Sequence, residues 1–342
     1  MSHHAVPLIL AGAIFLICTA RPLDGTQAQQ EAALLSEIGF SAQEVEKIRR
    51  GETVAKTTQA DSSAVALAVA STVAAPVDFY LEQFRDIVSF KKSPEVLQIG
   101  RFGHEPKSSD LSALTLEQPD VNDLRSCEPG DCGVKLDDHG IRAVAARDAR
   151  LDTASAALRQ YLAAYTLQYL QSGNGSLIAY HNASDPRRLA DDLRLILDRS
   201  GYLQRGWPPL FDAVGSFTGT LAAGLEGFVY WSKEKIGPRA IVSVTHAIIN
   251  PPREGSAAIA TKQIYASYYS HASLGLTILL DRSTVDAPRT RVIYVNRSRL
   301  DIFGGLFGGI KRAFVRSRAR DGAERTMARV RERVESSYRS RR

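Results

Sequence analysis

The pattern of apolar and polar positions in the last third of the chain predicts five consecutive strands followed by one long helix. The strand-like runs cover residues 227–233, 240–250, 257–267, 272–280 and 291–296, and Gly, Pro and Asp residues mark the links between them. After a glycine-rich link, apolar residues recur at spacings of three and four from Phe307 to Val334. Consecutive strands joined by short links form an antiparallel sheet, whose apolar face needs a helix to cover it. The pattern therefore predicts an α+β fold.

The preceding residues add further elements to this sheet and helix. Residues 29–50 form a short helical lead, in which Ser41 and Glu44 have capping-box spacing. Two strands are expected at 53–59 and 63–73, a helix at 77–87 and a strand at 95–102. Residues 105–225 are more polar at first, and then contain a helix at 153–172, a short strand at 176–180 and a helix at 185–199. A tyrosine stripe on the longest of these helices predicts packing against the sheet, with a ligand-facing wall as the alternative.

This order of elements is similar to that of the helix-grip fold of the START/polyketide-cyclase-like superfamily. The segments VAAPVDFYLEQFRDIVSFKK and YVNRSRLDIFGGLFGGIKRAFVRSRARDGAERTMARVRERVE carry the resemblance. It implies a curved antiparallel sheet wrapped around the C-terminal helix, with a hydrophobic cavity between them. The helix-grip-like core would comprise residues 63–104 and 226–342, with 29–62 as the lead and 105–225 as a mainly helical insertion. The resemblance also implies binding of lipids, sterols or other apolar small molecules, and catalysis only in some branches.

The N-terminus predicts export. An uncharged apolar stretch at 5–20 has the length of a signal-peptide core and is short for a membrane span, so residues 1–28 are interpreted as a signal peptide, with an uncleaved anchor or a buried N-terminal helix as alternatives. Cys127 and Cys132 flank a Pro-Gly turn that brings them close, and an oxidising compartment would join them. A redox or metal pair is the alternative. We expect a disulfide in a periplasmic or secreted protein.

The positive charge of the chain is concentrated at its C-terminus. Residues 297–342 carry fourteen Lys or Arg against five Asp or Glu, whereas residues 1–296 are net negative. Nucleic-acid-binding domains usually spread cations over a folded face, so no nucleic-acid partner is expected. The arginines suggest contact with an anionic membrane surface, although they could equally form the solvated face of a core helix. The candidates for that contact are Arg316, Arg318, Arg325, Arg329 and Arg333.

Candidate ligand-binding residues follow from the expected cavity. His246 and Tyr294 are polar side chains on apolar strands, and Phe307, Ile310 and Phe314 lie on the apolar face of the terminal helix. The alternative for His246 is a core histidine whose hydrogen bonds are made within the protein. Strict alternation would put Lys262 and Tyr265 on opposite faces of their strand, which argues against a paired site there.

The motifs carry no catalytic signature, and no cofactor or metal is expected. The sequence therefore predicts a carrier for a hydrophobic or lipid-like small molecule. The alternatives are a non-catalytic envelope interaction module that docks through the arginine-rich helix, and a hydrolase or cyclase that uses the same cavity.

Overall fold

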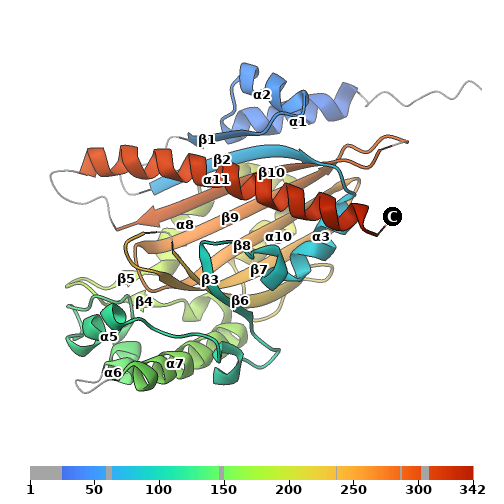
Figure 1. Cartoon of the computed structure of the whole chain (residues 1–342). Helices are drawn as coiled ribbons and strands as arrows, with labels where there is room; N and C mark the ends of the chain where they lie inside the picture. Colours follow the sequence, from blue (N-terminus) through green and yellow to red (C-terminus); the bar gives the residue numbers. More distant parts are fainter. Residues whose placement is uncertain are drawn as a thin grey trace, which may run out of the picture.

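A central antiparallel sheet divides the molecule into three layers (Figure 1). The computed structural model describes residues 25–58, 64–145, 150–235, 237–285, 287–301 and 308–341, without the side chains of 26, 58 and 308–318. The strand order is β1-β2-β10-β9-β8-β7-β6-β3. The strands are β1 (Val54–Thr58), β2 (Ala64–Val73), β3 (Val96–Arg101), β6 (Glu226–Glu234), β7 (Ile241–Arg253), β8 (Ser256–Ala266), β9 (Ser270–Asp281) and β10 (Thr290–Leu300). The predicted α+β class and every strand predicted for the sheet are confirmed.

One face of the sheet is covered by the C-terminal helix α11 (Gly308–Arg339), together with α3 (Val77–Arg85) and α4 (Ile87–Phe90). Met327 and Val334 of α11 are buried in one apolar cluster with aliphatic side chains of β2, β7, β8 and β9 and the aromatic residues of α3. The helix predicted at 77–87 is divided in two, because the Asp86 side chain accepts a hydrogen bond from the Ser89 amide and begins α4. The order strand, two short helices, strand, insertion, five strands, helix is therefore present.

The insertion covers the opposite face of the sheet. Its longest element is α7 (Leu151–Ser172), and α8 (Leu189–Leu197) lies over β9 and β10. The remaining elements of the insertion are η1 (Ser108–Leu111), α5 (Gln118–Arg125), α6 (Asp138–Val144), η2 (Gly173–Ser176), β4 (Ala179–Tyr180), β5 (Arg187–Arg188), α9 (Gly201–Gly206) and α10 (Pro208–Gly215). Since α5, α6, α9 and α10 each have only six to eight residues, their periodicity was too short to predict them.

The N-terminal lead packs beside the insertion at the β1–β2 edge. It consists of α1 (Gly25–Ile38) and α2 (Ala42–Arg49), and the predicted capping box of Ser41 and Glu44 is present. Residues 1–24, which hold most of the predicted export segment, lie outside the described residues. Within the described part of the chain, none of the helices is both long and apolar enough to cross a membrane.

Candidate functional site

The two polar anchors predicted for one cavity lie on opposite faces of the sheet. Tyr294 of β10 faces α11, where it packs against the apolar cluster of α3 and α11. His246 of β7 faces the insertion and contacts Tyr169 of α7. Phe307 and the side chains of Ile310 and Phe314 lie outside the described residues. Of the predicted cavity residues, the structure thus places Tyr294 on the α11 side and His246 away from it.

The α11 side of the sheet changes character along the strands. Toward the start of β10 it is aliphatic, with Val292, Leu279, Ile259 and Ile249 buried beneath α3 and α11. Toward the end of β10 it becomes polar, and its side chains are mostly half-buried. The polar group, which we call the polar strip, comprises Thr261, Gln263, Ser273, Thr277, Tyr294, Asn296 and Ser298.

Hydrogen bonds organise the polar strip. The Asn296 amide nitrogen donates to the Ser273 hydroxyl at 3.0 Å, and the Ser298 hydroxyl donates to Asn296 Oδ1 at 2.7 Å. The Ser273 and Ser298 hydroxyls lie 2.8 Å apart across β9 and β10. Three neighbouring polar side chains on two strands thus satisfy one another, so the strip presents a fixed set of donors and acceptors.

Tyr294 lies across the neighbouring strand because Gly275 leaves room for it. A Cβ atom at Gly275 would come within 2.4 Å of the Thr261 hydroxyl oxygen and 3.0 Å of the Tyr294 hydroxyl oxygen. Burial raises the pKa of Tyr294 to about 12, so its hydroxyl is neutral and remains a donor at ordinary pH. Gly275 therefore positions a neutral hydroxyl at the border between the polar strip and the aliphatic region.

An ion pair flanks the strip on the α4 and β6 side. Lys91 Nζ lies 2.7 Å from Glu234 Oε1 and 5.3 Å from the centre of the Tyr230 ring. The side chains retain 27% and 18% exposure. Burial raises the pKa of Glu234, but the Lys91 charge and hydrogen bond outweigh it and the net pKa is lowered. Burial lowers the pKa of Lys91, and Glu234 reverses that shift. Both groups are therefore charged.

The other face of the sheet holds a buried lysine without a carboxylate partner among the described residues. Lys262 of β8 is 0% exposed, and Nζ donates to Asn174 Oδ1 at 2.7 Å and to the Val214 carbonyl oxygen at 3.2 Å. Its amine lies 5.1 Å from the Tyr169 ring centre. Burial lowers the pKa of Lys262 to about 7. The insertion thus encloses an amine that is half protonated near pH 7 and loses its charge as the pH rises above that value.

His246 is the cross-strand neighbour of Lys262 and is 2% exposed. Its Nδ1 lies 2.8 Å from the Tyr169 hydroxyl oxygen. Burial, and then the nearby Lys262 charge, lower the pKa of His246 well below its usual value. A Cβ atom at Gly227 would lie 3.0 Å from His246 Nε2, so the strand backbone closes over that nitrogen. His246 and Lys262 therefore form a closed core contact between the sheet and the insertion.

The expectation that Lys262 and Tyr265 lie on opposite faces is wrong. The β7–β8 register shifts between Val244 and Thr245, so that Val244 faces Tyr265 whereas Thr245 faces Gln263. The extra residue, Ile264, is a β-bulge that reverses the alternation on one side of it. Its carbonyl oxygen accepts a hydrogen bond from the Tyr165 hydroxyl at 2.7 Å. Both Lys262 and Tyr265 consequently face the insertion.

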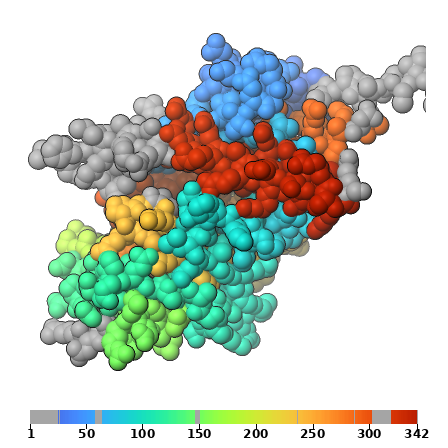
Figure 2. All heavy atoms as spheres, in the orientation of Figure 1, coloured from blue at the N-terminus to red at the C-terminus, as the bar shows by residue number. Residues whose placement is uncertain are grey.

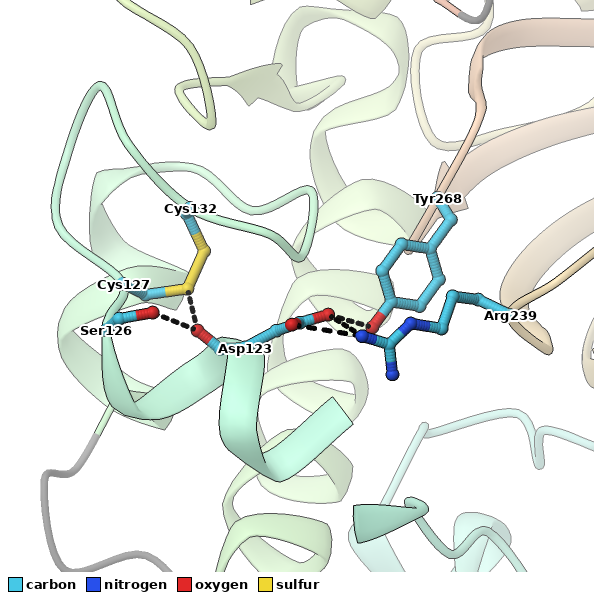
Figure 3. Close-up of a disulfide and its surroundings, with 6 residues drawn as sticks. All are labelled: Asp123, Ser126, Cys127, Cys132, Arg239 and Tyr268. Carbon is cyan, nitrogen blue, oxygen red and sulfur yellow. Dashed lines mark hydrogen bonds and ion pairs between the residues drawn. A yellow bond between two sulfur atoms is a disulfide. The ribbon is translucent and has the colours of Figure 1, made fainter. Parts of the chain in front are cut away.

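The predicted disulfide is present near the end of α5 (Figure 3). It joins Cys127 and Cys132 in a short loop close to Asp123, whose carboxylate contacts two side chains from the sheet region. The Tyr268 hydroxyl donates to Asp123 Oδ2 at 3.3 Å, and Arg239 forms an ion pair with it at 2.9 Å. The disulfide loop thus adjoins the contacts that fasten α5 to the end of β8.

Several arginines of α11 are engaged within the molecule. Arg329 forms an ion pair with Glu95 at 2.6 Å, and Arg333 donates to the carbonyl oxygens of Phe90 and Lys92. Arg325 is exposed. The side chains of Arg316 and Arg318 lie outside the described residues. The contacts of Arg329 and Arg333 attach α11 to the segment between α4 and β3.

Three comparisons with known proteins identify no relative of this chain. No family model, curated protein or solved structure matches the chain.

Proposed function

We propose that this chain is an exported protein that binds an amphipathic, lipid-like small molecule between the sheet and the N-terminal half of α11, in a helix-grip arrangement. The single observation that carries the proposal is the polar strip beside the aliphatic region on the α11 side. A wholly structural interface would gain most from continuous apolar packing. Here half-buried hydroxyl and amide groups lie next to aliphatic side chains, which suits a ligand that has both kinds of surface.

Tyr294 and the Lys91–Glu234 pair are the groups best placed to orient such a ligand. Tyr294 supplies a neutral hydroxyl at the border of the two regions, and Lys91 and Glu234 supply one charge of each sign. Apolar burial would provide most of the binding free energy, at about 25 cal/mol per Å². The disulfide and the apolar N-terminal stretch support an exported location.

Native mass spectrometry of the full chain, purified from the exported fraction without detergent, tests this proposal. A co-purifying small molecule of defined mass, recovered by solvent extraction, is the expected result. Tyr294→Phe should reduce its retention, whereas Tyr180→Phe, which removes a buried hydroxyl on the opposite face, should leave retention unchanged. An apo mass for the wild type, with no uptake from a mixed lipid extract, would overturn the proposal.

A second candidate is an envelope interaction module without a ligand. Its support is the dense packing of the described half of α11, where Met327 and Val334 are buried and Arg329 and Arg333 are bound to the α4–β3 segment. In that case α11 holds the sheet together, and its exposed arginines are available to a membrane or partner. An apo mass combined with binding to anionic vesicles would favour this second function.

A further inference from the structure

Arginine side chains surround a small hollow where α8 packs on the ends of β2 and β10. Arg297 and Arg299 are two residues apart on β10 and point to the same face, and Arg199 follows the end of α8. The hollow has a volume of about 10 Å³, and Leu195 and Ile196 line its α8 side. The register partners of Arg297 and Arg299 on β2 are Ala66 and Ala64, whose small side chains leave space for the guanidinium groups.

A buried carboxylate beside the hollow already pairs with two arginines, one of which is Arg299. Asp192, which is 2% exposed, accepts a hydrogen bond from Arg299 Nε at 2.6 Å and two from Arg187 at 2.7 Å. Within the described residues, no carboxylate forms an ion pair with Arg199 or Arg297. Among the described residues, the guanidinium charges of Arg199 and Arg297 are thus not matched by an ion-paired carboxylate.

The most specific indication that an anion binds in the hollow comes from Arg297. Its Nε atom is buried and has no hydrogen-bond partner within the described structure. Leaving a buried donor unpaired costs about 1–3 kcal/mol. The Tyr202 hydroxyl is hydrogen-bonded to the Arg297 side chain, but it remains neutral because burial raises its pKa. The C-terminal end of α8 contributes only a partial negative charge. A small anion in the hollow would satisfy this donor and offset the charges of Arg199 and Arg297.

We propose that Arg199, Arg297 and Arg299 form a binding site for an oxyanion, namely a phosphate, sulfate or carboxylate group. Guanidinium groups present several N–H donors in a planar fork that matches such anions. A volume of about 10 Å³ admits about one oxygen-sized atom. One anionic oxygen would enter toward Arg297 Nε, and the rest of the group would remain at the mouth beside the exposed Arg199. The site is on the insertion side of the sheet and is independent of the function proposed above.

Isothermal titration of the full chain with phosphate, sulfate and acetate, against sodium chloride at equal ionic strength, tests the proposal. We expect the wild type to bind at least one oxyanion, and Arg297→Gln and Arg199→Gln each to weaken that affinity at least tenfold. Arg194→Gln is the matched control, because Arg194 is an exposed arginine of the same helix that pairs with Asp191. Arg199→Gln changes an exposed side chain, so it remains informative if Arg297→Gln does not fold.

Flotation with phosphatidylglycerol vesicles distinguishes the source of the anion. Binding to vesicles that free phosphate competes away, and that Arg199→Gln weakens, would identify a lipid headgroup. Binding of free phosphate without flotation would identify a soluble anion. Two results would overturn the site. The first is a titration of the wild type in which the oxyanions give no more heat of binding than sodium chloride at equal ionic strength. The second is an oxyanion affinity in both glutamine variants that equals that of the wild type.

Discussion

Lys262→Met should change how the stability of this protein depends on pH. Lys262 is fully buried, and burial lowers its folded-state pKa to about 7, whereas lysine in an unfolded chain titrates near 10.4. Between these two values the unfolded chain binds more protons than the folded one. The free energy of unfolding of the wild type therefore rises with pH across this window. Methionine has a similar length and does not titrate, so the variant lacks this contribution.

The magnitude follows from the difference between the two pKa values. A difference of one bound proton gives a slope of about 1.4 kcal/mol per pH unit. Because the folded-state amine is half protonated near pH 7, the gain from pH 7 to 9 amounts to about 2 kcal/mol. The variant also leaves Asn174 Oδ1 and the Val214 carbonyl oxygen without the lysine donor. That loss lowers the free energy of unfolding of the variant by about 1–3 kcal/mol at every pH, so it does not change how the stability depends on pH.

Urea denaturation at pH 7, 8 and 9 measures the effect. The stability difference, wild type minus Lys262→Met, should increase by about 2 kcal/mol over this range. Lys235→Met is the matched control, because Lys235 is an exposed lysine at the end of β6, and its profile should parallel that of the wild type. Parallel profiles for wild type and Lys262→Met would refute the reasoning, since they would mean that folding does not change the protonation of Lys262.

Two further predictions concern other parts of the fold. Gly275→Val should destabilise the protein by about 1–3 kcal/mol, because a Cβ atom there meets Thr261 and Tyr294. Chemical denaturation measures the free energy of unfolding of this variant. A value equal to that of the wild type would show that β9 and β10 can separate at this point. Replacing both Cys127 and Cys132 with serine should lower stability by about 2 kcal/mol, as expected for a short closed loop. The same loss should appear in the wild type under a reductant, and no change in either experiment would show that the disulfide does not constrain the unfolded chain.

The sequence predicted the strands and the C-terminal helix because their signals are local. Apolar spacing of three and four along α11, and Gly or Pro residues in the links between strands, depend only on neighbouring residues. The helix caps were predicted less consistently. Ser41 and Glu44 form the expected box, whereas α7 begins at Leu151, two residues before the predicted start at 153. Local patterns therefore sufficed for the order of the elements, but not for all of their boundaries.

The arrangement of side chains on the two faces was harder to predict. Strands β7 and β8 are buried on both faces, so apolar residues are nearly continuous and alternation does not identify either face. Counting back from the turn at Glu254 and Gly255 also gives the wrong partner for His246. The register shift between Asn250 and Arg253 lies between the turn and His246, and it moves the partner of His246 from Gln263 to Lys262, whereas the shift at Val244 and Thr245 lies beyond His246. Nothing in a single sequence marks these bulges, so the pairing of His246 with Lys262 was not predictable.

The proposed anion site illustrates a different limit. The charge distribution along the sequence assigns Arg297 and Arg299 to a basic C-terminal stretch, although both belong to β10. Their spacing of two places them on one face, which was a usable signal. Their proximity to Arg199 depends on how the insertion folds back onto the sheet, and residues so far apart in sequence carry no local sign of contact.

The pairing of β2 with β10 has a consequence for how this chain folds. The two strands form one continuous ladder, from Ala64 with Arg299 to Val73 with Thr290, although more than two hundred residues separate them. Bringing such distant segments together costs loop-closure entropy before any contact offsets it, so we expect the ladder to form late. In the folded molecule the C-terminal helix α11 lies beside N-terminal segments (Figure 2, red and blue). During synthesis, however, the edge of β2 that pairs with β10 remains open until β10 has emerged. This edge of β2 is thus exposed to mispairing for most of that time, and a chaperone that protects the chain would act there first.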